Sequence, residues 1–175
     1  MPATYVIKSW SYSTTPIDKD GTLVRINGRA PGLLSWILSL MGIEATVSLV
    51  VNSDKVIFTE GSLAGSRHVI TPLDKTCSML YGFSKPWQEA LVYGIIIGAL
   101  TFFLALIPGI IFGIIYYILN KRVQIGFTDV GGRAYEINFK RSVIEGQKID
   151  EKEAKNVCQL IQDLVDVQRQ LPLPA

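Results

Sequence analysis

The chain has 175 residues, of which 49% are hydrophobic and 18% are charged, and its formal net charge is +2. This composition excludes a disordered chain, because disorder requires low hydrophobicity and high net charge. The balance of 17 basic against 15 acidic residues gives no indication of a nucleic-acid partner. Cys77 and Cys158 are too few for a disulfide framework, so we interpret them as free thiols.

Residues 1–86 are predicted to form the N-terminal strands of one domain. Apolar and polar residues alternate in this region, and turn-forming residues separate the segments. Trp10 and Tyr12 follow the alternation of the first segment less regularly than Tyr5 and Ile7 do. The predicted strands lie at 5–12, 22–29, 46–51, 55–60, 67–71 and 76–83.

Residues 31–42 form a short apolar segment that is too short to span a membrane. Pro31 suits the start of a helix and Gly42 suits its end. The segment predicts a helix packed on the sheet, an interfacial helix in the lipid headgroup zone, or a contact with neighbouring copies. Its apolar residues are Leu33, Trp36, Ile37, Leu40 and Met41.

Residues 87–120 stand out because no charged residue occurs between Glu89 and Lys121. A membrane span needs about 20 such residues, which a core helix seldom has. One interpretation is a single span kinked at Pro108; the other is a helical hairpin, running out over 87–106 and back over 109–120. Two strands follow this segment and must complete the preceding sheet on the same side, which favours the hairpin.

The residues expected to insert into the membrane fall into three kinds. Each arm carries one GxxxG motif, a spacing that lets helices approach closely. The motif of the first arm is formed by Gly94 and Gly98, and that of the second by Gly109 and Gly113. Pro108 and Gly109 mark the turn, and aromatic residues at both ends suit the membrane interface. These aromatic residues are Trp87, Tyr93, Tyr116 and Tyr117.

Charged residues flank the apolar run on both sides. Lys85 precedes the run and Lys121 and Arg122 follow it, which places both ends on the cytoplasmic side. With Arg29, these three residues are the candidate contacts for anionic lipid. Glu89 is interpreted as an interfacial residue paired with Lys85 or with water, and the alternative is a functional intramembrane carboxylate.

Residues 121–175 are predicted to form a strand pair and a helix that complete the domain. Apolar residues alternate over 123–127 and 135–139, and Asp129–Gly132 forms the turn between them. Asp150 followed by Glu153 is typical of a helix N-terminus. The apolar stripe after it predicts an amphipathic helix over 151–170.

The strand and helix pattern resembles bacterial membrane proteins with a pleckstrin-homology-like (PH-like) domain. The residues that carry the resemblance are Val47–Glu60, Arg67–Leu73 and Val123–Val165. The predicted fold class is therefore an α+β membrane protein. It has an antiparallel PH-like sheet or barrel, an amphipathic C-terminal helix, and a short transmembrane or re-entrant hairpin inserted between strands. The resemblance implies membrane-associated scaffolding or assembly and brings no catalytic residues.

No motif in the chain predicts catalysis. Walker A, HExxH and GxSxG patterns are all missing from the sequence, and His68 has no second histidine or cysteine at ligand spacing. We therefore predict no catalytic, cofactor-binding or metal-binding residues, and no cofactor. An enzyme that acts on lipid is the alternative from another class.

The predicted function is a non-enzymatic, membrane-anchored scaffold that self-assembles and organises or shapes membrane. Its partners are the lipid bilayer, further copies of the chain, and other membrane or cytoplasmic proteins. The predicted location is a membrane, with the PH-like domain in the cytoplasm. The alternative is a single-span subunit or sensor with a partner-binding domain.

Overall fold

The computed structural model describes residues 4–32, 46–62, 65–100, 106–140 and 149–170. The chain forms two compact units. The sheet unit comprises Met1–Gly82 and Val123–Ala175, and the hairpin unit comprises Phe83–Arg122.

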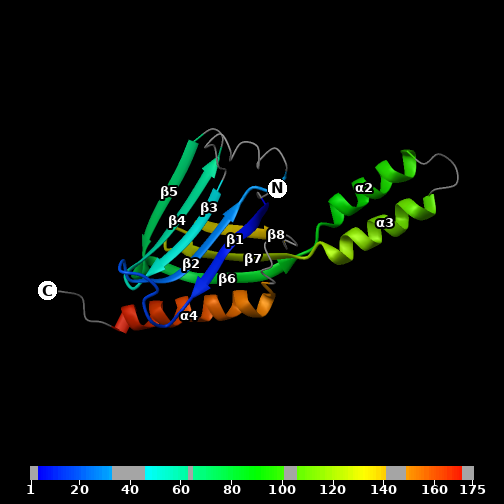
Figure 1. Ribbon diagram of the computed structural model, residues 1–175. Helices are drawn as coiled ribbons and strands as arrows, with labels where there is room; N and C mark the ends of the chain where they lie inside the picture. Colours follow the sequence, from blue (N-terminus) through cyan, green and yellow to red (C-terminus); the bar gives the residue numbers. More distant parts are fainter. Residues whose placement is uncertain (1–3, 33–45, 63–64, 101–105, 141–148, 171–175) are drawn as a thin grey trace. The chain divides into compact units, whose positions relative to one another are not determined.

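Eight strands form one sheet, in the order β5-β4-β3-β2-β1-β8-β7-β6 (Figure 1). Neighbouring strands from β1 to β5 are antiparallel, whereas β1 and β8 are parallel. The strands are β1 (Thr4–Tyr12), β2 (Thr22–Arg29), β3 (Thr46–Asn52), β4 (Lys55–Ser62), β5 (Gly65–Pro72), β6 (Thr76–Ser84), β7 (Arg122–Asp129) and β8 (Ala134–Lys140).

The predicted antiparallel PH-like sheet or barrel is wrong in two respects. The sheet is mixed, because Thr4, Tyr5 and Val6 of β1 pair in parallel with Asn138, Phe139 and Lys140 of β8. It is also open, because β5 and β6 stand at opposite ends of the strand order. The physical reason is that alternation identifies a strand and its buried face, but carries no information on its partner or direction.

A β-bulge in β1 explains the irregular alternation of its apolar residues. The register with β2 shifts between Ile7 and Ser9, which leaves Lys8 as an extra residue. The shift lets both Ile7 and Trp10 contact the core, although three positions separate them. The indole of Trp10 meets the ring of Phe139 edge to face, with ring centroids 6.0 Å apart.

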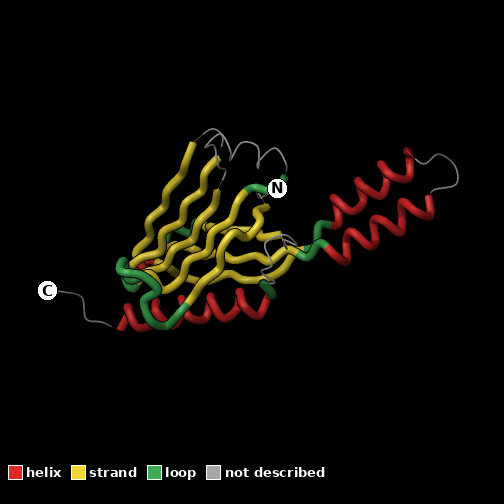
Figure 2. The backbone as a smooth tube through the Cα atoms, in the orientation of Figure 1, coloured by secondary structure: helices red, strands yellow, loops and turns green. Residues whose placement is uncertain are grey.

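The core lies between the sheet and the helix α4 (Glu151–Gln170), which has the predicted range (Figures 1 and 2). The buried stripe of α4 packs against strand residues such as Phe127 and Ile137. Burial raises the pKa of the Cys158 thiol to about 12, because the thiolate form loses its hydration. The buried residues of α4 are Ala154, Val157, Cys158, Ile161 and Val165.

Side chains of α4 also bond to the edge strand β6. The thiol of Cys158 donates to the carbonyl oxygen of Leu80 at 3.6 Å, and Arg169 Nη2 donates to the carbonyl oxygen of Thr76 at 2.8 Å. At the other end of α4, the Tyr12 hydroxyl of β1 donates to Glu153 Oε2 at 2.9 Å. The first two of these bonds occupy backbone carbonyl oxygens of an edge strand.

Some predictions fall on residues that the structure does not describe. Residues 33–45 belong to this set, so the helix expected over 31–42 is outside the described part of the chain. The three interpretations of that segment stay predictions.

Candidate functional site

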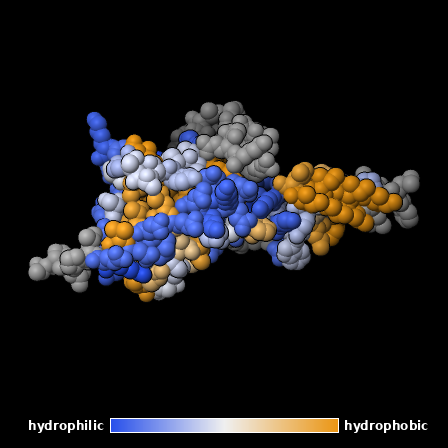
Figure 3. Space-filling model, turned by 90° about the horizontal axis from the view of Figure 1, so that it is seen from below, coloured by the Kyte–Doolittle hydropathy of each residue, from blue (hydrophilic) through white to orange (hydrophobic). Residues whose placement is uncertain are grey.

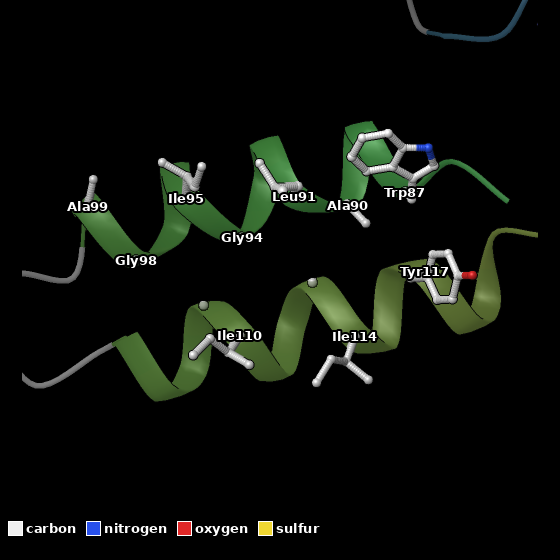
Figure 4. Close-up of a pocket in the computed structure, with 12 residues that line it drawn as sticks. Trp87, Ala90, Leu91, Gly94, Ile95, Gly98, Ala99, Ile110, Ile114 and Tyr117 are labelled. Atoms are coloured by element: carbon white, nitrogen blue, oxygen red, sulfur yellow. The ribbon is translucent and has the colours of Figure 1, made fainter.

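Two helices form most of the hairpin unit, α2 (Trp87–Leu100) and α3 (Leu106–Leu119) (Figures 1 and 4). Helix α2 begins after Pro86, whose carbonyl oxygen accepts the amide hydrogen of Ala90. Helix α3 ends at Leu119, and the backbone N–H and Nδ2 of the following Asn120 both donate to the carbonyl oxygen of Tyr116, each at 3.0 Å. The Asn120 side chain thus occupies a carbonyl oxygen at the C-terminal end of α3.

Helix α2 ends at Leu100 and helix α3 begins at Leu106, so the prediction of a turn at Pro108–Gly109 is wrong. Pro108 is the third residue of α3. At that position its missing N–H disrupts no hydrogen bond, because the first four amides of a helix have no intrahelical acceptor.

Glycines of both GxxxG motifs lie where the two helices approach most closely. A Cβ on Gly109 would lie 2.7 Å from the carbonyl oxygen of Gly94 and 3.0 Å from the Cα of Gly98. A Cβ on Gly113 would lie 3.2 Å from the carbonyl oxygen of Ala90. Glycine is required at Gly109 because the contacting atoms are backbone, which cannot turn away as a side chain could.

Ala90 belongs to the same close contact, although sequence reasoning did not include it. The spacing of four that links Gly94 and Gly98 continues back to Ala90. Ala90 is buried, and its carbonyl oxygen faces Gly113. A search for small residues at this spacing, instead of for glycine alone, would have found it.

Apolar side chains are exposed on both helices, except where the two helices pack together. Figure 3 shows this apolar surface on the face that it draws. Ile95 of α2 is 62% exposed, and Ile107 and Leu119 of α3 are 68% and 66% exposed. Neither helix has a polar face, which distinguishes them from the amphipathic α4. The large exposed residues of α2 and α3 are Trp87, Leu91, Val92, Tyr93, Ile95, Ile96, Ile107, Ile110, Ile111, Phe112, Ile114, Ile115, Tyr117, Ile118 and Leu119.

Among the described residues, no helix is both long enough and apolar enough to cross a membrane. The predictions of a membrane-protein fold class with a transmembrane or re-entrant hairpin, and of a membrane location with a cytoplasmic PH-like domain, are therefore corrected. The single-span alternative is wrong for the same reason. The charge-free run is divided into two helices of 14 residues, each about 21 Å long at 1.5 Å per residue.

A polar cluster lies at the base of the hairpin, where α2 begins and α3 ends. Arg122 Nη2 donates to Glu89 Oε2 at 2.5 Å, and the Tyr116 hydroxyl donates to the same oxygen at 3.3 Å. Burial, together with the Glu89 charge, raises the pKa of Tyr116. The predicted pairing of Glu89 with Lys85 is thus corrected, because the hairpin brings Arg122, which is distant in sequence, to this carboxylate.

Aromatic rings of the hairpin base contact one another and two lysines. The rings of Tyr93 and Tyr116 lie 5.0 Å apart between centroids. Lys85 Nζ lies 4.8 Å from the centroid of the Tyr117 ring, and Lys121 Nζ lies 4.3 Å from that of Phe83. An ammonium at this distance is attracted by the ring quadrupole.

The predicted site residues therefore separate into two groups. Those of the membrane-insertion group, from Trp87 to Tyr117, all belong to the hairpin unit. Of the predicted lipid contacts, Lys85, Lys121 and Arg122 lie at its base, whereas Arg29 lies in β2 of the sheet unit.

A groove of about 630 Å³ runs along one face of α2 and α3 (Figure 4). Gly94, Gly98 and Gly113 contribute to its lining, and Leu91 and Ile114 are among its larger side chains. The groove exists because these glycines have no side chains that could fill the space where the two helices meet. Its other lining residues are Trp87, Ala90, Ile95, Ala99, Gly109, Ile110 and Tyr117.

The described residues contain no group of three His, Cys, Asp or Glu side chains that could hold a metal ion. His68 lies on the exposed strand β5, where its Nδ1 is 3.1 Å from Thr59 Oγ1. The hairpin is apolar along its length and carries charged residues at its base.

No protein-family model, curated protein or solved structure matches the chain. The resemblance to bacterial PH-like domains therefore stays a prediction.

Proposed function

We propose that this chain is a non-enzymatic scaffold that self-assembles and organises lipid bilayers, which it contacts through the hairpin unit. The observation that carries the proposal is that apolar side chains are exposed on every side of α2 and α3 that does not pack against the other helix. A protein partner normally covers one face of a helix, whereas lipid surrounds it. The absence of any polar face on α2 and α3 therefore favours lipid.

The energetics support the same partner. Moving a large apolar side chain from water to an apolar environment is favourable by about 1.5–3 kcal/mol. Ile95 and Ile114, 62% and 53% exposed, are two of many such side chains on the hairpin. Within the hairpin unit the charged residues are confined to the base, at 85, 89, 121 and 122. The apolar length can thus contact the apolar part of the bilayer while the charged groups stay in water or at the headgroups.

The groove supports self-assembly between copies. Lipid supplies no hydrophobic drive for helices to associate, so close packing at small residues is what favours association. One side of the groove is lined by Gly94, Gly98 and Ala99, which have little or no side chain. A helix of a second copy could therefore pack there with its backbone close to α2. Assembly of many such copies would organise the bilayer that they contact.

Ile95→Asp is expected to weaken binding to phosphatidylcholine vesicles by at least about 30-fold. The substitution removes about 1.5–3 kcal/mol of favourable transfer of the isoleucine side chain from water to the apolar part of the bilayer, and a carboxylate is itself disfavoured there. Co-sedimentation with vesicles, over a range of lipid concentrations, measures the partition coefficient.

Val130→Asp is the matched control, because Val130 is 62% exposed but belongs to the sheet unit. It introduces the same charge at an equally exposed aliphatic position, and vesicle binding should be unchanged. Equal binding of wild type and Ile95→Asp, or no binding of the wild type, would contradict the proposed contact with lipid.

Ala99→Leu is expected to weaken self-association about tenfold in detergent micelles, because the longer side chain fills the groove that a second copy would occupy. Ala99 is exposed in the isolated chain, so the substitution leaves the packing between α2 and α3 intact. Sedimentation velocity measures the distribution of species. Val92→Phe, which adds volume outside the groove, should leave that distribution unchanged; an Ala99→Leu protein with the wild-type distribution would exclude this interface.

A further inference from the structure

The two edges of the sheet differ in how their backbone groups are occupied. At the edge strand β6, two carbonyl oxygens accept hydrogen bonds from the side chains of Cys158 and Arg169 of α4. The other edge strand, β5, pairs with β4 on one side, and no strand of the described part of the chain lies on its other side (Figure 1). A row of backbone N–H and C=O groups at β5 is therefore open to a further strand.

The strand β5 lacks the features that usually protect an open edge, which are lysines, bulges and inner prolines. Its pairing with β4 runs over Gly65–Pro72 without a shift in register, and its one proline is the last residue. It has no lysine, and its arginine contacts another strand, because the Arg67 guanidinium lies 5.6 Å from the centroid of the Tyr135 ring of β8. His68 Nδ1 lies 3.1 Å from Thr59 Oγ1 of β4.

A row of aliphatic side chains crosses β3, β4 and β5 and ends at the open edge. Val50 of β3 pairs with Ile57 of β4, and Ile57 pairs with Ile70 of β5. Val50 and Ile57 are half-buried, whereas Ile70, at the end of the row, is 64% exposed. An aliphatic side chain on a further strand would extend this row and cover Ile70.

We propose that β5 pairs antiparallel with β5 of a second copy of this chain, about a two-fold axis at Ile70. The axis makes the contact self-complementary, because the backbone groups of each edge meet those of the other. In this register the two Ile70 side chains lie opposite each other, and residues 68–72 of each strand overlap. Arg67 lies outside the overlap in both copies, so these two positive charges do not face each other.

Two observations identify a second copy as the occupant. The aliphatic row continues through the axis only if the added strand also presents an aliphatic side chain opposite Ile70, and β5 of a second copy does so. The β6 edge of another copy is a poor partner, because α4 already occupies carbonyl oxygens there. This contact belongs to the sheet unit, so it goes beyond the proposed function and requires neither lipid nor the groove of the hairpin unit.

Sedimentation velocity in detergent micelles tests the contact in an Ala99→Leu background, where the proposed groove contact is blocked. This background should sediment as a dimer, and adding Ile70→Lys should raise the dimer dissociation constant at least about tenfold, because two like charges would lie opposite each other. Adding Val167→Lys instead is the control, since Val167 is 58% exposed on α4 and gains the same charge. The control should remain a dimer.

A disulfide tests the position of the axis. Directly opposed Cβ atoms of antiparallel strands lie about 4.5–5.5 Å apart, near the about 3.5–4.5 Å of a disulfide. With Ala99→Leu and Cys77→Ser as background, Ile70→Cys should therefore form a covalent dimer on mild oxidation. Val167→Cys, at the exposed position on α4, should stay monomeric in a denaturing gel.

The outcomes separate this contact from the proposed function. A monomeric Ala99→Leu protein, or equal effects of Ile70→Lys and Val167→Lys, would overturn the β5 contact and leave the groove and the contact with lipid standing. Cross-linking of Ile70→Cys that is no faster than that of Val167→Cys would overturn the axis at Ile70. A wild-type distribution of species in Ala99→Leu that is lost only with Ile70→Lys would support the β5 contact and exclude the groove.

Discussion

Gly126→Ala is expected to destabilise the sheet unit by about 3 kcal/mol, at the upper end of overpacking effects. A Cβ on Gly126 of β7 would overlap the carbonyl oxygen of Tyr135 and lie 3.0 Å from the Cα of Glu136. Both atoms belong to the backbone of β8, so the two strands would have to separate. Thermal unfolding followed by circular dichroism should show a midpoint lower by about 10 °C.

Gly82→Ala is the matched control for this substitution. Gly82 is also a strand glycine of the sheet unit, in β6, but a Cβ there would lie 3.8 Å from Gln124 Oε1, an ordinary contact. Its midpoint should stay within about 1–2 °C of the wild type, since a compatible Gly→Ala change alters stability by less than about 1 kcal/mol. Equal midpoints for Gly126→Ala and Gly82→Ala would show that β7 and β8 do not approach as described.

Gly109→Leu is expected to separate α2 from α3. The contacts of Gly109 are backbone atoms of Gly94 and Gly98, so the larger side chain can be accommodated only if the helices move apart. Helices in contact through ordinary side chains lie about 8–10 Å apart, whereas small residues allow a closer approach. The helices themselves should persist, because leucine favours helix more than glycine by about 0.8 kcal/mol.

The separation can be measured with spin labels on cysteines placed at Val92 and Ile115, which are both exposed. A Cys77→Ser background removes the exposed native thiol, and the buried Cys158, with its raised pKa, stays unlabelled. Gly109→Leu should lengthen the distance between labels by about 2–3 Å, while Ile111→Leu, an isomeric change at an exposed position, should not. An unchanged distance in both would contradict the close contact at Gly109.

The position of the turn in the hairpin determines which other features could be predicted. Proline and glycine at 108–109 indicate a turn in most contexts, yet Pro108 lies in the first turn of α3, where proline is tolerated. With the turn placed between 100 and 106, Glu89 comes opposite Tyr116 and Arg122. The misplaced turn is therefore why the Glu89–Arg122 ion pair was missed.

The bulge in β1 shows a similar limit in the sheet unit. The uneven spacing from Ile7 to Trp10 is visible in the sequence, but the pairing with β2 is needed to interpret it as an extra residue at Lys8. The amphipathic helix α4, by contrast, depends on residues three and four apart, and its range over 151–170 follows from local periodicity alone.

Composition and short-range periodicity are enough to identify the strand-rich character of the chain, the amphipathic C-terminal helix and the position of the apolar run. The parallel pairing of β1 with β8, the open sheet, and the division of the apolar run into two helices packed at Gly94, Gly98 and Gly109 become visible only in three dimensions. These features depend on which distant segments meet. A strand pattern identifies its buried face but not its neighbour, and a charge-free run does not specify where it reverses.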